Sequence, residues 1–197
     1  MNYVQIRKTL NNKNIREFSK ETLRAVFNLT EPAAISLLKR YKSKGYIKNP
    51  KRNLYFFSDA FPTPFALAYK MYSPSYISFE TALSLYGIIP EVTYTVISAT
   101  TKTTREFSFE NTLYKYQKVK TKAFTGYLKK EEYLIADPEK ALVDYLYFVA
   151  IEGKTLNDRL DLSKLNKKAV MGYAALFDNK VLDRVVENIY DKPRRVK

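Results

Sequence analysis

The chain has 197 residues, 46% of them hydrophobic, and carries 34 basic and 20 acidic residues for a net charge of +14. This length fits one large or two small folded domains, and the apolar content excludes a disordered tail. Cysteine and histidine are both absent, which excludes disulfides, thiolate or imidazole metal ligands and Ser-His-Asp hydrolysis. No apolar run approaches the roughly 20 residues of a membrane span. The first residues, MNYVQIRKTLNNKNIREF, lack the apolar region of a secretion signal, so we expect a cytoplasmic protein with no membrane partner.

The positive charge is concentrated near the start of the chain. Residues 1–57 hold 13 basic and three acidic residues, a net charge of +10, whereas residues 58–197 hold 21 and 17, a net charge of +4. A concentrated positive field attracts polyanions and releases their counterions on binding. We therefore expect a nucleic-acid partner. A basic surface that serves only solubility is the alternative.

The first third of the chain predicts three helices. Residues 3–10 form the first, and the asparagine-rich segment 11–14 ends it. Apolar residues between positions 15 and 27 predict a second helix, with Ser19 as its N-cap. The third helix begins after Thr30 as N-cap, and Gly45 fits the left-handed position just beyond its end.

The third helix has two faces with different compositions. Its apolar residues follow the spacing i, i+3, i+4, i+7, which predicts a buried stripe of Ala34, Leu37, Leu38 and Tyr41. The other side carries the residues that we expect to face DNA, namely Thr30, Ala33, Ser36, Lys39, Arg40 and Ser43. Arg40 is the candidate for sequence specificity, because arginine reads base edges in the major groove. Ile35 belongs to neither face and either packs on the second helix or meets a thymine methyl group.

Two short β-like runs follow, around a turn at residues 49–53. The turn carries Lys51, Arg52 and Asn53, where the tip of a hairpin would touch a phosphate backbone or a minor groove. Lys42, Lys44 and Lys48 are candidates for neutralising phosphates. Helix, helix, turn, helix and hairpin is the order of a winged helix-turn-helix DNA-binding domain, which we place at residues 1–60. A winged helix that makes protein contacts is the alternative.

Residues 61–197 predict a second domain of mixed α/β composition, so the fold class is α+β. Residues 59–64 contain two prolines, which favour extended backbone and predict a linker between the domains. We expect a mostly antiparallel sheet with strands at 92–99, 105–109, 113–119 and 133–136. Helices are expected at 65–72, 79–86, 137–153, 166–177 and 180–190, the last two forming a C-terminal pair, and the basic tail 191–197 is expected to be frayed.

A carboxylate-dependent nuclease is the enzyme that the second domain allows. Asp137, Glu139 and Lys140 follow a predicted strand, an arrangement that faintly resembles metal-dependent nucleases. Helix chemistry explains the same residues, because Asp137 suits an N-cap, Glu139 suits the positive helix end and Lys140 is then a solvated side chain. We favour the helix interpretation, and expect Asp144 to be partly buried beside a basic partner.

The sequence indicates no further catalytic or cofactor site. It has no GxGxxG or GxxxxGK[ST] phosphate loop, so we expect no cofactor, no metal and no catalytic residues. Four lysines, Lys115, Lys118, Lys120 and Lys122, follow one another along an extended segment and predict a possible second basic stripe.

Three stretches of the chain resemble the AbiEi antitoxin family of abortive-infection, type IV toxin–antitoxin systems. They are LKRYKSKGYIKNPKRNLYFF (38–57), YISFETALSLYGII (76–89) and LIADPEKALVDYLYF (134–148). The first is shared by many regulators, whereas the other two together are specific. Tyr86 stands where the family often has histidine, and Asn53 stands where it often has glycine.

The resemblance implies a two-domain transcriptional autorepressor and antitoxin. Its N-terminal domain would bind inverted repeats in double-stranded operator DNA at its own promoter. Separately from the resemblance, the sequence has no hydrophobic heptad typical of an obligate coiled-coil dimer, so we expect a monomer that pairs on DNA. Its C-terminal domain would counteract a nucleotidyltransferase-like toxin without a stable complex, as part of antiviral defence. A winged-helix regulator with a ligand-sensing C-terminal domain remains the first alternative, and the nuclease the second.

Overall fold

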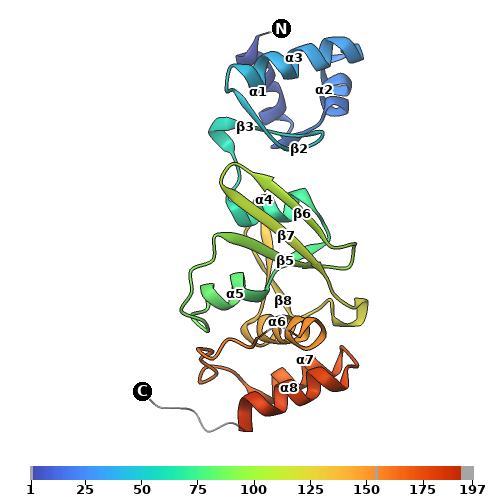
Figure 1. Cartoon of the computed structure of the whole chain (residues 1–197). Helices are drawn as coiled ribbons and strands as arrows, with labels where there is room; N and C mark the ends of the chain where they lie inside the picture. Colours follow the sequence, from blue (N-terminus) through green and yellow to red (C-terminus); the bar gives the residue numbers. More distant parts are fainter. Residues whose placement is uncertain (1, 154, 192–197) are drawn as a thin grey trace. The chain divides into compact units, whose positions relative to one another are not determined.

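The computed structural model describes residues 2–153 and 155–191, so the basic segment 192–197 lies outside the described residues. The chain divides into two compact units, Met1–Thr63 and Pro64–Lys197, called here the N-terminal and C-terminal units. The division falls three residues after the boundary placed between residues 60 and 61. Both units combine helices and strands (Figure 1), which is consistent with the α+β class. Within the described residues, no helix has the length and apolarity to cross a membrane.

The N-terminal unit contains three helices and a three-stranded antiparallel sheet. In chain order the elements are α1 (Tyr3–Asn12), β1 (Glu17–Phe18), α2 (Lys20–Phe27), α3 (Glu31–Ser43), β2 (Ile47–Lys51) and β3 (Leu54–Phe57). The strand order is β1-β3-β2, so β3 lies between the other two. β2 and β3 form the hairpin expected from the sequence, followed by a short 3-10 turn at Ser58–Ala60.

The buried stripe of α3 is confirmed. Its buried residues are Ala34, Leu37, Leu38 and Tyr41. Three of these join a core with residues from the other helices and the sheet, namely Ile6, Leu10, Phe18, Leu23, Ile47 and Phe57. Fully burying a side chain the size of leucine contributes about 1.5–3 kcal/mol to the stability of the fold. The buried stripe therefore determines which side of α3 remains exposed.

Two local predictions for this unit need correction, and a third holds in position without its expected hydrogen bond. Phe18 is not helical, because it forms β1 and pairs with Tyr55 of β3. The sequence indicates Val4 and Leu10 as the apolar positions of the first helix; Leu10 is buried, but Val4 is 67% exposed and Ile6 enters the core instead. Thr30 occupies the N-cap position of α3, but its side chain makes no capping hydrogen bond.

Two other features of the unit agree with the predictions from the sequence. Ser19 caps α2 by accepting from the backbone N–H of Thr22 at 3.1 Å. Gly45 has a φ of +71° just beyond the end of α3, a conformation that favours glycine.

The C-terminal unit is built on a six-stranded sheet with the order β6-β7-β5-β4-β9-β8. The strands are β4 (Ser75–Ile77), β5 (Thr95–Thr100), β6 (Arg105–Phe109), β7 (Thr112–Lys118), β8 (Tyr127–Lys130) and β9 (Tyr133–Ala136). The helices are α4 (Pro64–Met71), α5 (Phe79–Leu85), α6 (Pro138–Glu152), α7 (Lys167–Ala175) and α8 (Lys180–Asp191). α7 and α8 pack on α6 and on each other (Figure 1).

The sheet is mixed, whereas the sequence predicted mostly antiparallel pairing. β5 pairs with β7 and β4 pairs with β9 in parallel, while β4–β5, β6–β7 and β8–β9 are antiparallel. β4 and β8 were not assigned as strands, because runs of three and four residues give little periodicity of their own. The strand expected at 92–99 begins only at Thr95 and continues to Thr100.

The parallel pair β4–β9 brings together the segments 76–89 and 134–148. Ile77 of β4 is in register with Ile135 of β9. The Tyr86 hydroxyl donates to the backbone carbonyl of Ala136 at 2.8 Å. Further along, the rings of Phe79 and Phe148 meet edge to face, with their centroids 5.4 Å apart. The two segments therefore form one packed assembly inside the C-terminal unit.

A buried ion pair between Lys140 and Asp144 lies at the centre of this assembly. Both side chains are fully buried, and the Lys140 ammonium pairs with the Asp144 carboxylate one helical turn away. The other carboxylate oxygen accepts hydrogen bonds from the Tyr76 hydroxyl at 2.9 Å and the Ser78 hydroxyl at 2.7 Å. The prediction that Lys140 is solvated is wrong, and Lys140 is the basic partner that was expected for Asp144.

Ser78 illustrates how this network changes a local expectation. A serine directly before the helix at 79–86 predicts an N-cap, and Ser78 does occupy the N-cap position of α5 but makes no side-chain capping bond. Its hydroxyl donates a hydrogen bond to the Asp144 carboxylate instead.

The ion pair also has shifted pKa values. Burial lowers the pKa of Lys140 and raises the pKa of Asp144, and the charge of each residue opposes the pKa shift of the other.

We predict that Lys140→Met destabilises the protein by about 3–5 kcal/mol, because it leaves a buried carboxylate without its cation. The double variant Lys140→Met/Asp144→Asn removes both charges and keeps an oxygen that accepts from Tyr76 and Ser78. It should therefore be more stable than the single variant. Urea denaturation of the full chain measures both free energies of unfolding. A double variant less stable than Lys140→Met would contradict this account of the pair.

Candidate nucleic-acid interface

The expected DNA-facing residues of α3 are all exposed. Thr30 lies at the N-cap and the others, Ala33, Ser36, Lys39, Arg40 and Ser43, lie on the helix away from the core. Of the expected phosphate contacts, Lys42 lies in the last turn of α3 and Lys44 at its C-cap. The tip residues Arg52 and Asn53 are exposed in the turn between β2 and β3, and Lys51 is half-buried at the end of β2.

A groove with a volume of about 450 Å³ runs between α3, the start of α2 and the hairpin. Its lining residues are Lys20, Glu21, Ile35, Leu38, Lys39, Lys42, Asn49, Arg52, Asn53 and Tyr55. Ile35, Lys39 and Lys42 are spaced by four and three residues, so they share one flank of α3. The groove thus receives cations from α3, from α2 and from the hairpin tip.

Arg40 lies outside this groove. It is two helical turns from Ala33, which places these two residues on the other flank of the exposed face. Its guanidinium carbon is 5.3 Å from the ring centroid of Tyr41. The exposed face of α3 therefore has two basic flanks, one with Lys39 and Lys42 beside the hairpin and one with Arg40.

The hairpin tip is fastened to the N-terminus of α2 by Asn53. Its side-chain oxygen accepts from the backbone N–H of Lys20 at 2.9 Å, and its side-chain nitrogen donates to the Glu21 carboxylate at 2.6 Å. Asn53 has a φ of +61°, which asparagine tolerates better than most residues. The residue expected to contact DNA therefore has its amide occupied by α2, and it holds the hairpin tip, which lines the groove, to the start of α2.

Asn49 fixes the hairpin from within. Its side-chain nitrogen donates to the carbonyl of Lys51 at 2.6 Å and to that of Leu54 at 2.8 Å. The strand register shifts between Lys48 and Lys51, so these bonds span an irregular part of the hairpin. The two asparagines hold Arg52 at a defined place beside α3.

The start of α2 is also joined to the start of α3. Lys20 forms an ion pair with Glu31, and Arg24 lies 3.7 Å from the other oxygen of the same carboxylate. The neighbouring Lys20 ammonium lowers the pKa of Glu31. Lys20 is therefore largely neutralised, whereas Lys39, Lys42 and Arg52 form no ion pair within residues 2–153 and 155–191.

Lys48 lies on the other face of the sheet. It is paired in register with Phe56, whereas the neighbouring Phe57 enters the core under the helices. Its ammonium is 4.8 Å from the ring centroid of Phe61. Lys48 therefore lies on the sheet face away from the core under the helices, and its predicted contact with a phosphate stays a prediction.

The second basic stripe is not one strand face. Lys115 and Lys118 are three residues apart on β7, so they point to opposite faces, and Lys115 lies 3.2 Å from Glu106. β7 ends at Lys118, and Lys122 lies in a 3-10 turn at Thr121–Ala123. The Lys120 ammonium donates to the carbonyls of Phe177 and Asp178. The predicted alternation fails because the chain leaves the strand before Lys120.

The residues Asp137, Glu139 and Lys140 each have a structural contact. Asp137 caps α6 by accepting from the Lys140 backbone N–H at 2.8 Å, and it also accepts from the Tyr173 hydroxyl. Glu139 accepts from the backbone N–H of Asn166 at 3.0 Å. Within the described residues, no three acidic side chains are grouped so that they could hold a metal ion.

Sequence reasoning missed two residues that shape the groove, Lys20 and Asn49. The sequence patterns assigned no role to Lys20, and they predicted Asn49 only as part of a turn. Their roles depend on contacts with Glu31 and Leu54, which no local pattern reveals.

No protein-family model matches the chain, and no curated protein matches it either.

We predict that Asn53→Gly raises the pKa of Glu21 from about 2 toward its ordinary value near 4.5, because the bond from Asn53 is the largest cause of the lowering. Glycine suits the positive φ, so only the amide is lost. In the native chain this bond stabilises the fold above pH 4.5, and the contribution disappears as the pH falls toward 2. Carbon-detected NMR of the Glu21 carboxyl measures the titration.

Asn14→Gly is the matched control, since Asn14 also has a positive φ of 55°. It should leave the Glu21 titration unchanged. An unchanged Glu21 pKa in Asn53→Gly would mean that the hairpin tip is not held to α2 in this way.

Proposed function

We propose that residues 1–60 form a winged helix-turn-helix domain that binds double-stranded DNA. The exposed face of α3 enters the major groove, and the β2–β3 hairpin lies against the phosphate backbone or the adjacent minor groove. Support comes from the order of the elements and from the exposed polar face on α3. The net charge of +10 on residues 1–57 gives the electrostatic attraction that such binding needs.

One observation carries this proposal. Lys39 and Lys42 from α3 and Arg52 from the hairpin line the same groove, and none of them forms an ion pair within the part of the chain that the structure describes. Like charges held close together repel each other unless a counter-charge is present. A DNA backbone supplies that counter-charge along a continuous line. These three cations are therefore proposed to grip phosphates.

We further propose that the chain is a transcriptional autorepressor and antitoxin of a type IV toxin–antitoxin system. This part of the proposal comes from the resemblance of residues 38–57, 76–89 and 134–148 to the AbiEi family. The packing of the second and third of these segments around Asp144 supports treating them as one motif. Monomers would pair on inverted repeats at the chain's own promoter, and the C-terminal unit would counteract a nucleotidyltransferase-like toxin without a stable complex.

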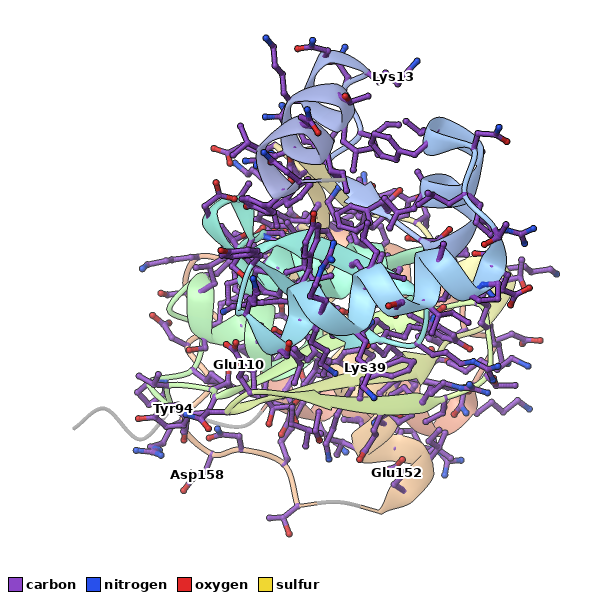
Figure 2. The ribbon with its side chains drawn as sticks, turned by 90° about the horizontal axis from the view of Figure 1, so that it is seen from above. Lys13, Lys39, Tyr94, Glu110, Glu152 and Asp158 are labelled. Atoms are coloured by element: carbon purple, nitrogen blue, oxygen red, sulfur yellow. The ribbon has the colours of Figure 1, made fainter. Side chains whose placement is uncertain are left out.

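We predict that Lys39→Gln/Lys42→Gln lowers the slope of log affinity against log salt concentration by about 2, because each phosphate contact contributes about 0.9 to this slope. The control variant Lys8→Gln/Lys13→Gln removes the same charge from exposed positions on and just after α1. Lys13 is labelled well apart from Lys39 in Figure 2. Fluorescence anisotropy with duplex DNA carrying the promoter region gives both slopes.

The control variant should keep the native slope. Equal slopes in the two double variants would show that the charge acts without a defined site. Absence of duplex binding by the native chain at low salt would refute the proposed DNA-binding function.

The antitoxin proposal predicts that the chain restores growth of cells that express the nucleotidyltransferase-like product of the neighbouring gene. A chain truncated after residue 63 should fail to do so, because the C-terminal unit is missing. Colony counts after induction measure the rescue, and immunoblots confirm that both chains accumulate. Full rescue by residues 1–63, or no rescue by the whole chain, would contradict the assignment.

A further inference from the structure

Ile35 is an apolar side chain on a basic surface. It is 49% exposed and lies on α3 between the helix N-terminus and Lys39. It lines the groove together with Lys39, Lys42 and Arg52. The hydrophobic core of the N-terminal unit includes other α3 residues but not Ile35. The core therefore leaves about half of Ile35 exposed.

The chemistry around Ile35 restricts what can cover it. A ligand of this groove has to be anionic, because Lys39, Lys42 and Arg52 surround the site and only Glu21 is acidic. It also has to present a small apolar group to the isoleucine. Duplex DNA meets both requirements, since its phosphates are anionic and the 5-methyl of thymine is the apolar group exposed in the major groove.

The position of Ile35 along α3 suits such a contact. Recognition helices place their N-terminal residues on base edges, and Ile35 is the fifth residue of α3. Lys39 and Lys42 follow on the same flank, nearer the C-terminal end. In the proposed complex the ammonium groups of Lys39 and Lys42 contact phosphates at the edge of the DNA major groove, and Ile35, one turn nearer the N-terminus of α3 than Lys39, faces the base edges.

We infer that Ile35 contacts the 5-methyl group of a thymine and makes the chain prefer thymine at that position. This inference rests on the proposed binding of duplex DNA by the N-terminal unit. It adds a contact that depends on the base sequence, whereas Lys39, Lys42 and Arg52 are proposed to contact only the phosphate backbone of the DNA. It also assigns a role to an exposed side chain that neither the core nor the phosphate contacts use.

Replacement of thymine by deoxyuridine tests the contact, because this removes the methyl group and keeps all base-pairing groups. The full-length chain is first used to enrich duplexes from a random-sequence library. The best duplex is then synthesised again with each thymine replaced in turn by deoxyuridine. Fluorescence anisotropy at one salt concentration gives the affinity of the native chain and of each variant.

The native chain should bind about fourfold more weakly when the contacted thymine becomes deoxyuridine, which corresponds to the burial of one methyl group. Ile35→Ala should bind the two duplexes equally. Val4→Ala is the matched control, since Val4 is exposed on α1, outside the groove, and it should keep the fourfold difference. Ile35→Val retains a branched side chain and should keep most of the difference.

The outcomes separate the two proposals. If no duplex is enriched, DNA binding itself fails, and with it the role of Ile35. If duplexes bind but deoxyuridine has no effect at any position, DNA binding stands and the thymine contact is refuted. The contact is equally refuted if Ile35→Ala keeps the full sensitivity to deoxyuridine while its circular dichroism spectrum matches that of the native chain.

Discussion

The tip of the β2–β3 hairpin is held to the first turn of α2 by the side chain of Asn53, and the groove depends on this attachment. One amide both satisfies a backbone N–H at the start of the helix and donates to the Glu21 carboxylate. Helix N-termini leave such N–H groups without intrahelical partners, so the helix gains a cap and the hairpin gains a fixed position. Arg52 is thereby kept beside Lys39 and Lys42, although they are distant in sequence.

The same unit shows how a buried stripe determines an exposed surface. Ala34, Leu37, Leu38 and Tyr41 bind α3 to the core. Once that side is fixed, the period of the helix leaves the remaining residues on two exposed flanks. One flank combines Ile35 with lysines beside the hairpin, and the other carries Arg40. The proposed division between backbone contacts and base contacts follows from this geometry.

The C-terminal unit depends on a different constraint, the burial of a charged pair. Lys140 and Asp144 are stable inside the protein only because each has a partner and Asp144 also accepts from Tyr76 and Ser78. The Tyr76 hydroxyl comes from β4 and the Ser78 hydroxyl from the N-cap position of α5, whereas both charges come from α6. The ion pair therefore ties the segment 76–89 to the segment 134–148, the two stretches on which the resemblance to the antitoxin family rests.

Local chemistry predicted the parts of the fold that depend on nearby residues. The stripe on α3, the cap at Ser19, the left-handed Gly45 and the bounds of β6 and β9 could all be read from sequence. Features that depend on distant partners could not. β1 exists because Phe18 pairs with Tyr55, and the burial of Lys140 with Asp144 depends on the hydrogen bond that the distant Tyr76 hydroxyl donates to Asp144.

The candidate site was likewise predictable from sequence only where it depends on nearby residues. The exposed residues of α3 followed from periodicity, because a helix with a known inner face has a known outer face. The groove did not, since it requires the contacts of Asn53 with Lys20 and Glu21, more than 30 residues earlier in the chain. The lysines at 115–122 were grouped wrongly, because strand alternation was extended past the end of β7.

The central claim is that α3 and the hairpin together form a DNA-binding surface. It is tested most directly by titrating the isotope-labelled full chain with its promoter duplex and following the backbone amide signals by NMR. The account predicts that the largest shifts fall at positions 30–43 and 51–53, with small changes along α1. The largest shifts in the C-terminal unit, with α3 unaffected, would contradict it.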